Sequence, residues 1–259
     1  MRFSRAMISM GPRDAPVRVV FVPHAGGSAM SYLPLARTLP DSCETHLVEP
    51  AGRGSRYDEP FPENFAAAVA ALRAEVAPLL DRPTVIVGHS LGGLLAHELV
   101  STLPTRAVAW VAAVVVSASR SPVATAAAAT HPPAPFVRRT RRQLVDELRT
   151  RGGCPAEVFT EPDMLDNTIR VLGHDLHLAD TYLAPAADPA DVPYHLWFGR
   201  DDPFVDPATA HQWSPSLARS PSVRAFPGDH FYLGARPEPV AALRDLLDAL
   251  DERVWATAG

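Results

Sequence analysis

The chain of 259 residues is long enough for one large α/β domain, and hydrophobic residues make up 47% of it, enough for a sizeable core. The formal net charge of −5 is small, which argues against nucleic acid as a bulk electrostatic partner. Cys43 and Cys154 lie far apart and outside any C-x-x-C spacing, so neither a zinc site nor a disulfide framework is indicated. No apolar run reaches membrane-spanning length, and we expect a cytoplasmic protein with no membrane partner.

Strand and helix patterns alternate along the first half of the chain. Short apolar runs rich in β-branched residues predict strands at 18–22, 46–49, 84–88 and 108–116. Helical patterns lie between and after them, at 31–39, 65–80 and 94–100. This alternation predicts a mostly parallel sheet with helices on both faces.

The alternation stops after Ser117. The segment 120–191 has no clear strand, and its helical patterns fall at 140–150 and 162–183. It is too short and too rich in proline to form a large core of its own, so we expect a helical lid over the active site. Strand patterns return at 194–199 and 223–226, and a helical pattern at 237–250 ends the chain. We therefore expect a single α/β domain over residues 1–259, with 120–191 as the lid.

A G-x-S-x-G motif stands at the junction between a predicted strand and the helix that follows it. Gly88 and Gly92 bracket Ser90 there. A serine on such a tight turn sits in strained backbone, and side chains two residues away on either side would collide. The turn raises the serine hydroxyl above the sheet, next to a helix N-terminus that favours negative charge. The motif predicts that Ser90 is a nucleophile.

A serine hydroxyl needs a base, and the base needs a carboxylate that orients it. His230 follows a predicted strand in a glycine turn, and no other histidine has an equivalent place. The carboxylate comes from Asp201 or Asp202, after the strand 194–199. We favour Asp202, because it lies past the turn, and expect Asp201 to cap the next helix. The order Ser, Asp, His is the one that this architecture uses.

The oxyanion hole is expected to combine two backbone N–H groups. One belongs to Leu91, directly after the nucleophile. The other belongs to the glycine-rich turn after the first predicted strand, where we choose Ala25 and keep Gly26 as the alternative. His24 and His89 flank the site by position, and we expect them to shape these turns. Surface or core roles are expected for the remaining candidate histidines, which are His174, His177, His195 and His211.

Four segments of the chain resemble the type II thioesterases that accompany polyketide synthases and nonribosomal peptide synthetases. They are P-H-A-G-G-S at 23–28, P-A-G-R-G-S-R at 50–56, G-H-S-L-G-G at 88–93 and G-D-H-F at 228–231. Two further segments resemble the cap of this family, namely Leu148-Arg149-x-x-Gly152-Gly153 and Asp175-x-x-Leu178-x-x-x-Tyr182.

This resemblance implies an α/β-hydrolase fold and a catalytic triad of Ser90, Asp202 and His230. It also implies a reaction, the hydrolysis of acyl groups from the phosphopantetheine arm of acyl or peptidyl carrier proteins. We expect no metal and no cofactor beyond that arm. The residues expected to contact the substrate are Gly26, His24, His89 and Phe231, and the apolar stripes of the lid are expected to cover an aliphatic chain.

Other functions stay open at this stage. A carboxylesterase or lipase on the same fold would carry the same triad, and a thioesterase could also release or cyclise a product. A non-enzymatic binding module is disfavoured, because all three triad positions are filled.

Four arginines gather at the start of the first lid helix: Arg138, Arg139, Arg141 and Arg142. We favour a solvated helix end, with Asp146 and Glu147 as their partners. A basic rim for a phosphate or an acidic carrier protein is the alternative.

Overall fold

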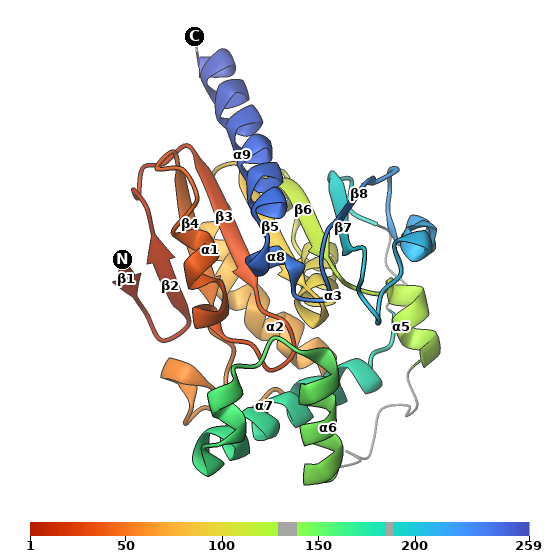
Figure 1. The fold of residues 1–259 in the computed structure, drawn as a ribbon. Helices are drawn as coiled ribbons and strands as arrows, with labels where there is room; N and C mark the ends of the chain where they lie inside the picture. Colours follow the sequence, from red (N-terminus) through yellow and green to blue (C-terminus); the bar gives the residue numbers. More distant parts are fainter. Residues whose placement is uncertain (129–138, 185–188, 259) are drawn as a thin grey trace.

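An eight-stranded sheet forms the centre of the molecule in the part of the chain that the structure describes (Figure 1). This computed structural model describes residues 1–128, 139–184 and 189–258, the last six as backbone alone. The strands are ordered β1-β2-β4-β3-β5-β6-β7-β8. All pairs from β4 to β8 are parallel, and β1 and β2 add an antiparallel edge. The strands are β1 (Arg2–Phe3), β2 (Met7–Met10), β3 (Val17–Val22), β4 (Cys43–Val48), β5 (Thr84–His89), β6 (Val111–Ser117), β7 (Tyr194–Gly199) and β8 (Ser222–Phe226).

Helices cover both faces of the sheet, as the alternating pattern predicts. One face carries α1 (Leu33–Ala36), α8 (Tyr232–Ala235) and α9 (Pro237–Ala258), which lie in front of the strands in Figure 1. The other face carries α2 (Phe65–Val76), α3 (Leu91–Ser101) and α4 (Thr105–Val108). Alternate strand residues enter the two cores: Val19 and Phe21 pack on the first face, Val20 and Val22 on the second.

Single turns of 3-10 helix complete several connections. They are η1 (Ala29–Tyr32), η2 (Gly54–Arg56), η3 (Ala77–Leu79), η4 (Ala156–Phe159) and the longer η5 (Pro207–Ser216). None of the helices in the described residues combines the length and apolar composition that crossing a membrane requires.

The segment between β6 and β7, here named the helical insertion, contains α5 (Pro122–Ala128), α6 (Arg141–Arg151) and α7 (Pro162–Asp180). No strand occurs in its described residues, in line with the sequence pattern. Figure 1 shows α6 and α7 below one end of the sheet. Most of their apolar side chains pack α6 onto α7, through Leu144, Leu148, Ile169, Leu172 and Leu176. The expected stripes therefore form the insertion's own core rather than a continuous apolar cover.

The other side of α7 attaches the helical insertion to the body of the protein. Leu178 and Tyr182 pack against side chains of α2 and α3, which are Phe65, Val69, Leu91 and Leu94. The hydroxyl of Tyr182 donates a hydrogen bond to the buried carboxylate of Glu98 on α3. The helix α7 is thus shared between two apolar clusters.

Several predicted elements have different bounds in the structure. The pattern at 31–39 becomes η1 and the short α1, and the pattern at 65–80 becomes α2 and η3. The strand predicted at 108–116 begins only at Val111, because Pro104 starts a helical turn that the amides of Val108 and Ala109 complete. The antiparallel pair β1 and β2 has no counterpart among the predicted strands.

Strand register brings the functional loops together. Val22 of β3 pairs with Gly88 of β5, and Gly88 pairs with Val116 of β6. Gly199 of β7 pairs with Phe226 of β8. The carboxyl ends of parallel strands meet at one edge, so the loops after these strands open toward the same side, which the helical insertion covers.

Candidate active site

Ser90 occupies a strained turn between β5 and α3. Its backbone has φ 54° and ψ −120°, in the region that side-chain-bearing residues rarely adopt. A Cβ atom on Gly88 would lie 2.1 Å from the carbonyl oxygen of Gly92, and one on Gly92 would lie 2.2 Å from that of Val22. Both glycines are therefore required by close backbone contacts, as the motif predicts.

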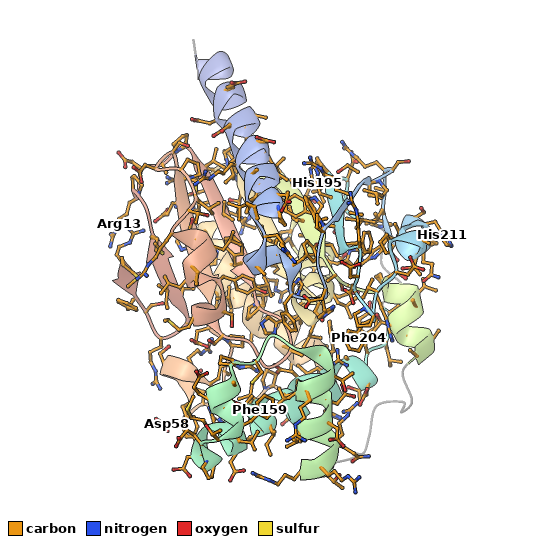
Figure 2. The ribbon with its side chains drawn as sticks, in the orientation of Figure 1. Arg13, Asp58, Phe159, His195, Phe204 and His211 are labelled. Carbon is orange, nitrogen blue, oxygen red and sulfur yellow. The ribbon has the colours of Figure 1, made fainter. Side chains whose placement is uncertain are left out.

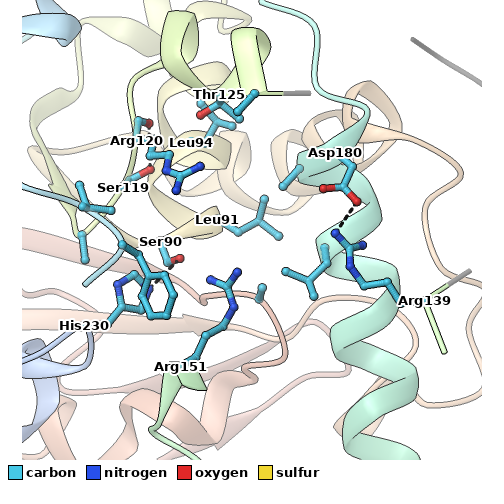
Figure 3. Close-up of a pocket in the computed structure, with 17 residues that line it drawn as sticks. Ser90, Leu91, Leu94, Ser119, Arg120, Thr125, Arg139, Arg151, Asp180 and His230 are labelled. Atoms are coloured by element: carbon cyan, nitrogen blue, oxygen red, sulfur yellow. Dashed lines mark hydrogen bonds and ion pairs between the residues drawn. The ribbon is translucent and has the colours of Figure 1, made fainter. Parts of the chain in front are cut away.

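The structure joins Ser90, His230 and Asp202 in one chain of hydrogen bonds. His230 Nε2 lies 3.1 Å from Ser90 Oγ, the contact dashed in Figure 3, and His230 Nδ1 lies 2.7 Å from Asp202 Oδ2. Because a carboxylate can only accept, Nδ1 carries the proton and Nε2 turns its lone pair toward the Ser90 hydroxyl. Both partners are shielded from water, since the side chain of His230 is 3% exposed and that of Asp202 is 0% exposed.

Backbone amides hold the carboxylate of Asp202 in place. Its Oδ1 accepts hydrogen bonds from the N–H groups of Phe204, at 2.8 Å, and Val205, at 3.2 Å. The neighbouring Asp201 is exposed. Its backbone N–H donates to the carbonyl of Gly228, and its carboxylate has no hydrogen-bond partner among the described residues. The structure thus places Asp202 against His230. The expectation that Asp201 caps the next helix is wrong, because Asp206 caps η5 by accepting from Ala208 N–H.

The two backbone groups expected to form the oxyanion hole lie beside the serine. Ala25 and Leu91 line the same cavity as Ser90. Gly26, the alternative to Ala25, donates its N–H to Asp175 Oδ2 at 2.8 Å and is therefore occupied. This contact favours Ala25 as the second donor.

A buried ion pair connects the helical insertion to this turn. Arg53 Nη1 and Nη2 each donate to one oxygen of Asp175 at 2.6 Å, and Nη1 also donates to the carbonyl of Gly27 at 2.9 Å. Burial raises the pKa of Asp175, but the charge of Arg53 and hydrogen bonds from His174, Arg53 and Gly26 outweigh it and lower the pKa to about 2. Both residues stand in segments that resemble the family, but the sequence predicts no pairing between them, because they lie 122 positions apart.

Aromatic rings pack around the imidazole of His230. Ring centroids of His89 and Phe231 each lie 5.2 Å from it, and His24 lies 5.0 Å from Phe231. Burial lowers the pKa of both His24 and His89, so each is neutral near pH 7. His89 Nδ1 pairs with the hydroxyl of Ser117 at 2.9 Å.

The residues expected to contact the substrate line a second cavity. Its volume is about 520 Å³, and Gly26, His24, His89 and Phe231 all belong to its wall, whereas Ser90 and His230 line a smaller cavity of about 180 Å³. The remaining histidines have structural surroundings. His174 Nε2 lies 2.7 Å from the carbonyl oxygen of Pro62, His195 Nδ1 lies 2.7 Å from the Ser222 hydroxyl, and His211 Nδ1 lies 2.8 Å from the carbonyl oxygen of Ala208. Figure 2 shows His195 and His211 at the surface of the molecule.

The arginines of α6 pair mostly with acidic side chains. Arg142 reaches Asp146 at 3.9 Å, as expected for a solvated helix end, but Glu147 pairs with Arg151 at 2.8 Å instead. Two of the cluster pair across to α7: Arg141 with Asp166, and Arg139 with Asp180. Arg138 lies outside the described residues.

Within the described residues, no group of three or more His, Cys, Asp or Glu side chains is arranged to hold a metal ion. Cys43 is buried and Cys154 partly buried, and both are free thiols.

Comparison with known proteins assigns most of the chain to one family. The family model for the thioesterase domain matches residues 17–248. A probable cadicidin biosynthesis thioesterase from Streptomyces griseus is 30% identical over 84% of this chain, which spans only 58% of that relative. The gramicidin S biosynthesis protein GrsT from Aneurinibacillus migulanus is 26% identical, with 85% of this chain and 84% of the relative covered. The type II thioesterase BorB of the borrelidin cluster superposes with a TM-score of 0.81 at 26% identity, over 95% of this chain and 99% of that one.

Proposed function

Because the chain belongs to the thioesterase-domain family, we propose that it hydrolyses acyl thioesters through a covalent acyl-enzyme on Ser90. The fold is an α/β-hydrolase fold. The observation that carries the proposal is the hydrogen-bonded chain from Ser90 through His230 to Asp202, at 3.1 and 2.7 Å. Similar relatives are named for the biosynthesis of antibiotics, which supports a substrate carried by a biosynthetic enzyme.

In the first half of the reaction, Ser90 Oγ attacks the thioester carbonyl while His230 Nε2 accepts the hydroxyl proton. Asp202 keeps Nδ1 protonated and stabilises the imidazolium that forms. The backbone N–H groups of Ala25 and Leu91 stabilise the negative charge on the carbonyl oxygen. The proton on Nε2 then passes to the departing thiolate, leaving the acyl group on Ser90.

In the second half, a water molecule replaces the thiol. His230 accepts a proton from the water as the water attacks the acyl-enzyme, and the same two amides stabilise the second tetrahedral oxyanion. Returning this proton to Ser90 Oγ releases the carboxylic acid and restores the free enzyme. The neutral His24 and His89 add no positive charge beside the imidazolium of His230, so no neighbouring cation opposes the stabilisation of that imidazolium by Asp202.

The substrates that we propose are acyl groups on the phosphopantetheine arm of an acyl or peptidyl carrier protein. The match to BorB, titled a type II thioesterase from a biosynthetic cluster, supports this class, and so does the match to GrsT. We favour removal of stalled or wrong acyl groups over cyclisation, because the second half of the proposed reaction uses water as the acceptor.

The test compares the wild type with Ser90→Ala on the same acyl group presented as a pantetheine thioester and as an oxygen ester. Ser101→Ala is the matched control, since Ser101 ends the same helix and its hydroxyl, within the described residues, bonds to the His97 carbonyl alone. We expect the Ser90 variant to lose about 10⁴-fold or more in kcat on the thioester. Near-parental turnover would refute the role of Ser90, and equal wild-type rates on both esters would favour a general esterase.

A further inference from the structure

The cavity in front of Ser90 contains more positive than negative side chains. Three arginines line it in the described residues, namely Arg120, Arg139 and Arg151, against one acidic residue, Asp180. Figure 3 shows Arg120 and Arg151 reaching into the cavity from different sides, with Ser90 and His230 at one end and the Arg139–Asp180 pair at the other. Two of the three arginines are ion-paired, Arg139 with Asp180 and Arg151 with Glu147, so one positive charge remains unmatched in the described lining. An aliphatic acyl group would leave that charge without a partner, so the lining points to an anionic substrate group.

Arg120 is the cation whose charge is left unmatched. It lies three residues after the end of β6, and its side chain has no ion pair or hydrogen bond in the part of the chain that the structure describes. Arg139, by contrast, is neutralised by Asp180 at 2.6 Å. A carboxylate is a well-matched partner for such an arginine, because the planar guanidinium can donate two parallel hydrogen bonds to the two carboxylate oxygens.

Arg151 is held close to the catalytic imidazole. Its Nε donates to Glu147 at 2.8 Å, and its guanidinium lies 4.9 Å from the centre of the Phe204 ring. That ring lies 5.4 Å from the ring of His230. Only Nε is used in these contacts, so both terminal nitrogens of Arg151 can donate into the cavity.

We infer that this cavity takes a short acyl group that ends in a carboxylate, a malonyl-type half-thioester, with the carboxylate held by Arg120 and Arg151. The inference rests on the proposed thioesterase function and names its substrate class. Hydrolysis adds water across the thioester bond, giving the free dicarboxylic acid and the thiol.

The size of the cavity favours the acyl carboxylate over the phosphate of the carrier arm. Ser90, both expected oxyanion donors and the arginines share a volume of about 180 Å³. The arm's phosphate is separated from the thioester sulfur by the whole pantetheine chain, so a phosphate would lie well beyond the side chains that share this cavity with Ser90. A carboxylate two carbons from the reacting carbonyl fits within it.

The experiment compares malonyl and isovaleryl, each as a thioester of pantetheine and of phosphopantetheine. The two acyl groups have the same branched shape, because two methyl groups of isovaleryl replace the two carboxylate oxygens of malonyl. The variants are Arg120→Gln and Arg151→Gln. The matched control is Arg149→Gln. Arg149 lies on α6 like Arg151, but its guanidinium packs over the Phe159 ring, and it does not line the cavity.

We expect each test variant to lose about tenfold in kcat/KM on both malonyl substrates, the size of one charge-assisted hydrogen bond, and less than about twofold on isovaleryl. The control should change neither. Equal losses of kcat/KM on malonyl and isovaleryl thioesters would overturn the inference. Losses on the phosphopantetheine thioesters but not on the pantetheine thioesters would also overturn it, because the arginines would then bind the phosphate of the arm.

The same assay separates this inference from the proposed function. If Ser90 is required for hydrolysis of isovaleryl-pantetheine but the arginine variants do not lower kcat/KM on malonyl thioesters, the substrate class is refuted and the proposed thioesterase function is retained. Failure of the wild type on all four substrates refutes both.

Discussion

The carboxylate of Asp175, on α7, is bound by both terminal nitrogens of Arg53, in the loop after β4, through two hydrogen bonds of 2.6 Å. Both side chains are buried, and the pair extends to the turn that carries Ala25. Asp175 accepts the N–H of Gly26, and Arg53 donates to the carbonyl of Gly27. One ion pair therefore fixes both the helical insertion and the proposed oxyanion turn.

Removing this pair should lower kcat even where stability is restored. Asp175→Leu alone leaves the Arg53 charge buried and should destabilise the fold by about 3–5 kcal/mol, whereas combining it with Arg53→Met should recover most of that loss. The double variant still lacks the acceptor for Gly26 and the donor to Gly27, so we expect kcat to fall about tenfold to a hundredfold. Denaturant unfolding and steady-state kinetics measure the two effects. Parental kcat in the stable double variant would contradict this role.

The same pair predicts a loss of stability in acid. The pKa of Asp175 is about 2, below its ordinary value of 3.8, so ionised Asp175 stabilises the folded state above pH 4. This contribution, about 2 kcal/mol, is lost as the pH falls from about 4 to about 2. Unfolding of the wild type should show this extra loss relative to the Arg53→Met, Asp175→Leu variant. Parallel pH profiles of the two proteins would refute it.

Two adjacent aspartates offer an internal control for the proposed triad. Asp202→Asn removes the acceptor that keeps the His230 proton on Nδ1, and we expect kcat to fall about 10⁴-fold. Asp201→Asn should stay within about twofold of the wild type, since the exposed carboxylate of Asp201 plays no part in that chain. Thioester hydrolysis at saturating substrate measures both. The reverse ranking would show that the wrong aspartate has been assigned.

Glycine substitutions test the close packing around the Ser90 turn. A Cβ on Gly92 would meet the Val22 carbonyl at 2.2 Å, so Gly92→Ala should destabilise the protein by about 1–3 kcal/mol and disturb the serine. Gly234, within α8, is the control, since its Cβ would meet nothing within 4 Å. Gly234→Ala should be neutral or stabilising by up to about 1 kcal/mol. Thermal unfolding compares the two, and equal effects would contradict the packing argument.

A buried carboxyl away from the site predicts a pH effect of opposite direction. Burial raises the pKa of Glu98, so the folded state binds its proton more tightly than the unfolded chain does. Its stabilising contribution is therefore complete below pH 4.5 and is lost as the pH rises through the raised pKa. Glu98→Gln keeps an acceptor for the Tyr182 hydroxyl without a charge. The variant should gain in Tm over the wild type at pH 8 and gain less at pH 5; a gain independent of pH would contradict the assignment.

The parts of the site that sequence reasoning located are those with a local pattern. Ser90 is bracketed by glycines two residues away, and His230 lies in a short turn directly after a strand. Such turns depend on a few neighbouring residues, so their chemistry is visible in the sequence. The choice between Asp202 and Asp201 has no such local pattern, because the features that distinguish them, the contact of Asp202 with His230 and the amides of Phe204 and Val205, appear only in the folded structure.

The missed features depend on contacts between distant segments. Arg53 and Asp175 meet only because α7 crosses the end of the sheet, and no spacing rule connects positions 122 residues apart. The strand Met7–Met10 is short and lies between β1 and β4, and its pairing with both supplies what its own pattern lacks. The stripe of α6 was correctly predicted as apolar, but periodicity cannot tell whether such a stripe faces a substrate or another helix.

Trapping the covalent intermediate would show whether Ser90 carries the acyl group during turnover. Wild-type protein mixed with an acyl-pantetheine thioester is quenched in acid within the first turnover, digested and analysed by mass spectrometry. We predict that the mass of the acyl group appears on the peptide containing Ser90, and that His230→Ala forms this adduct far more slowly. Hydrolysis with no adduct on Ser90, or with the acyl group on another residue, would contradict the account.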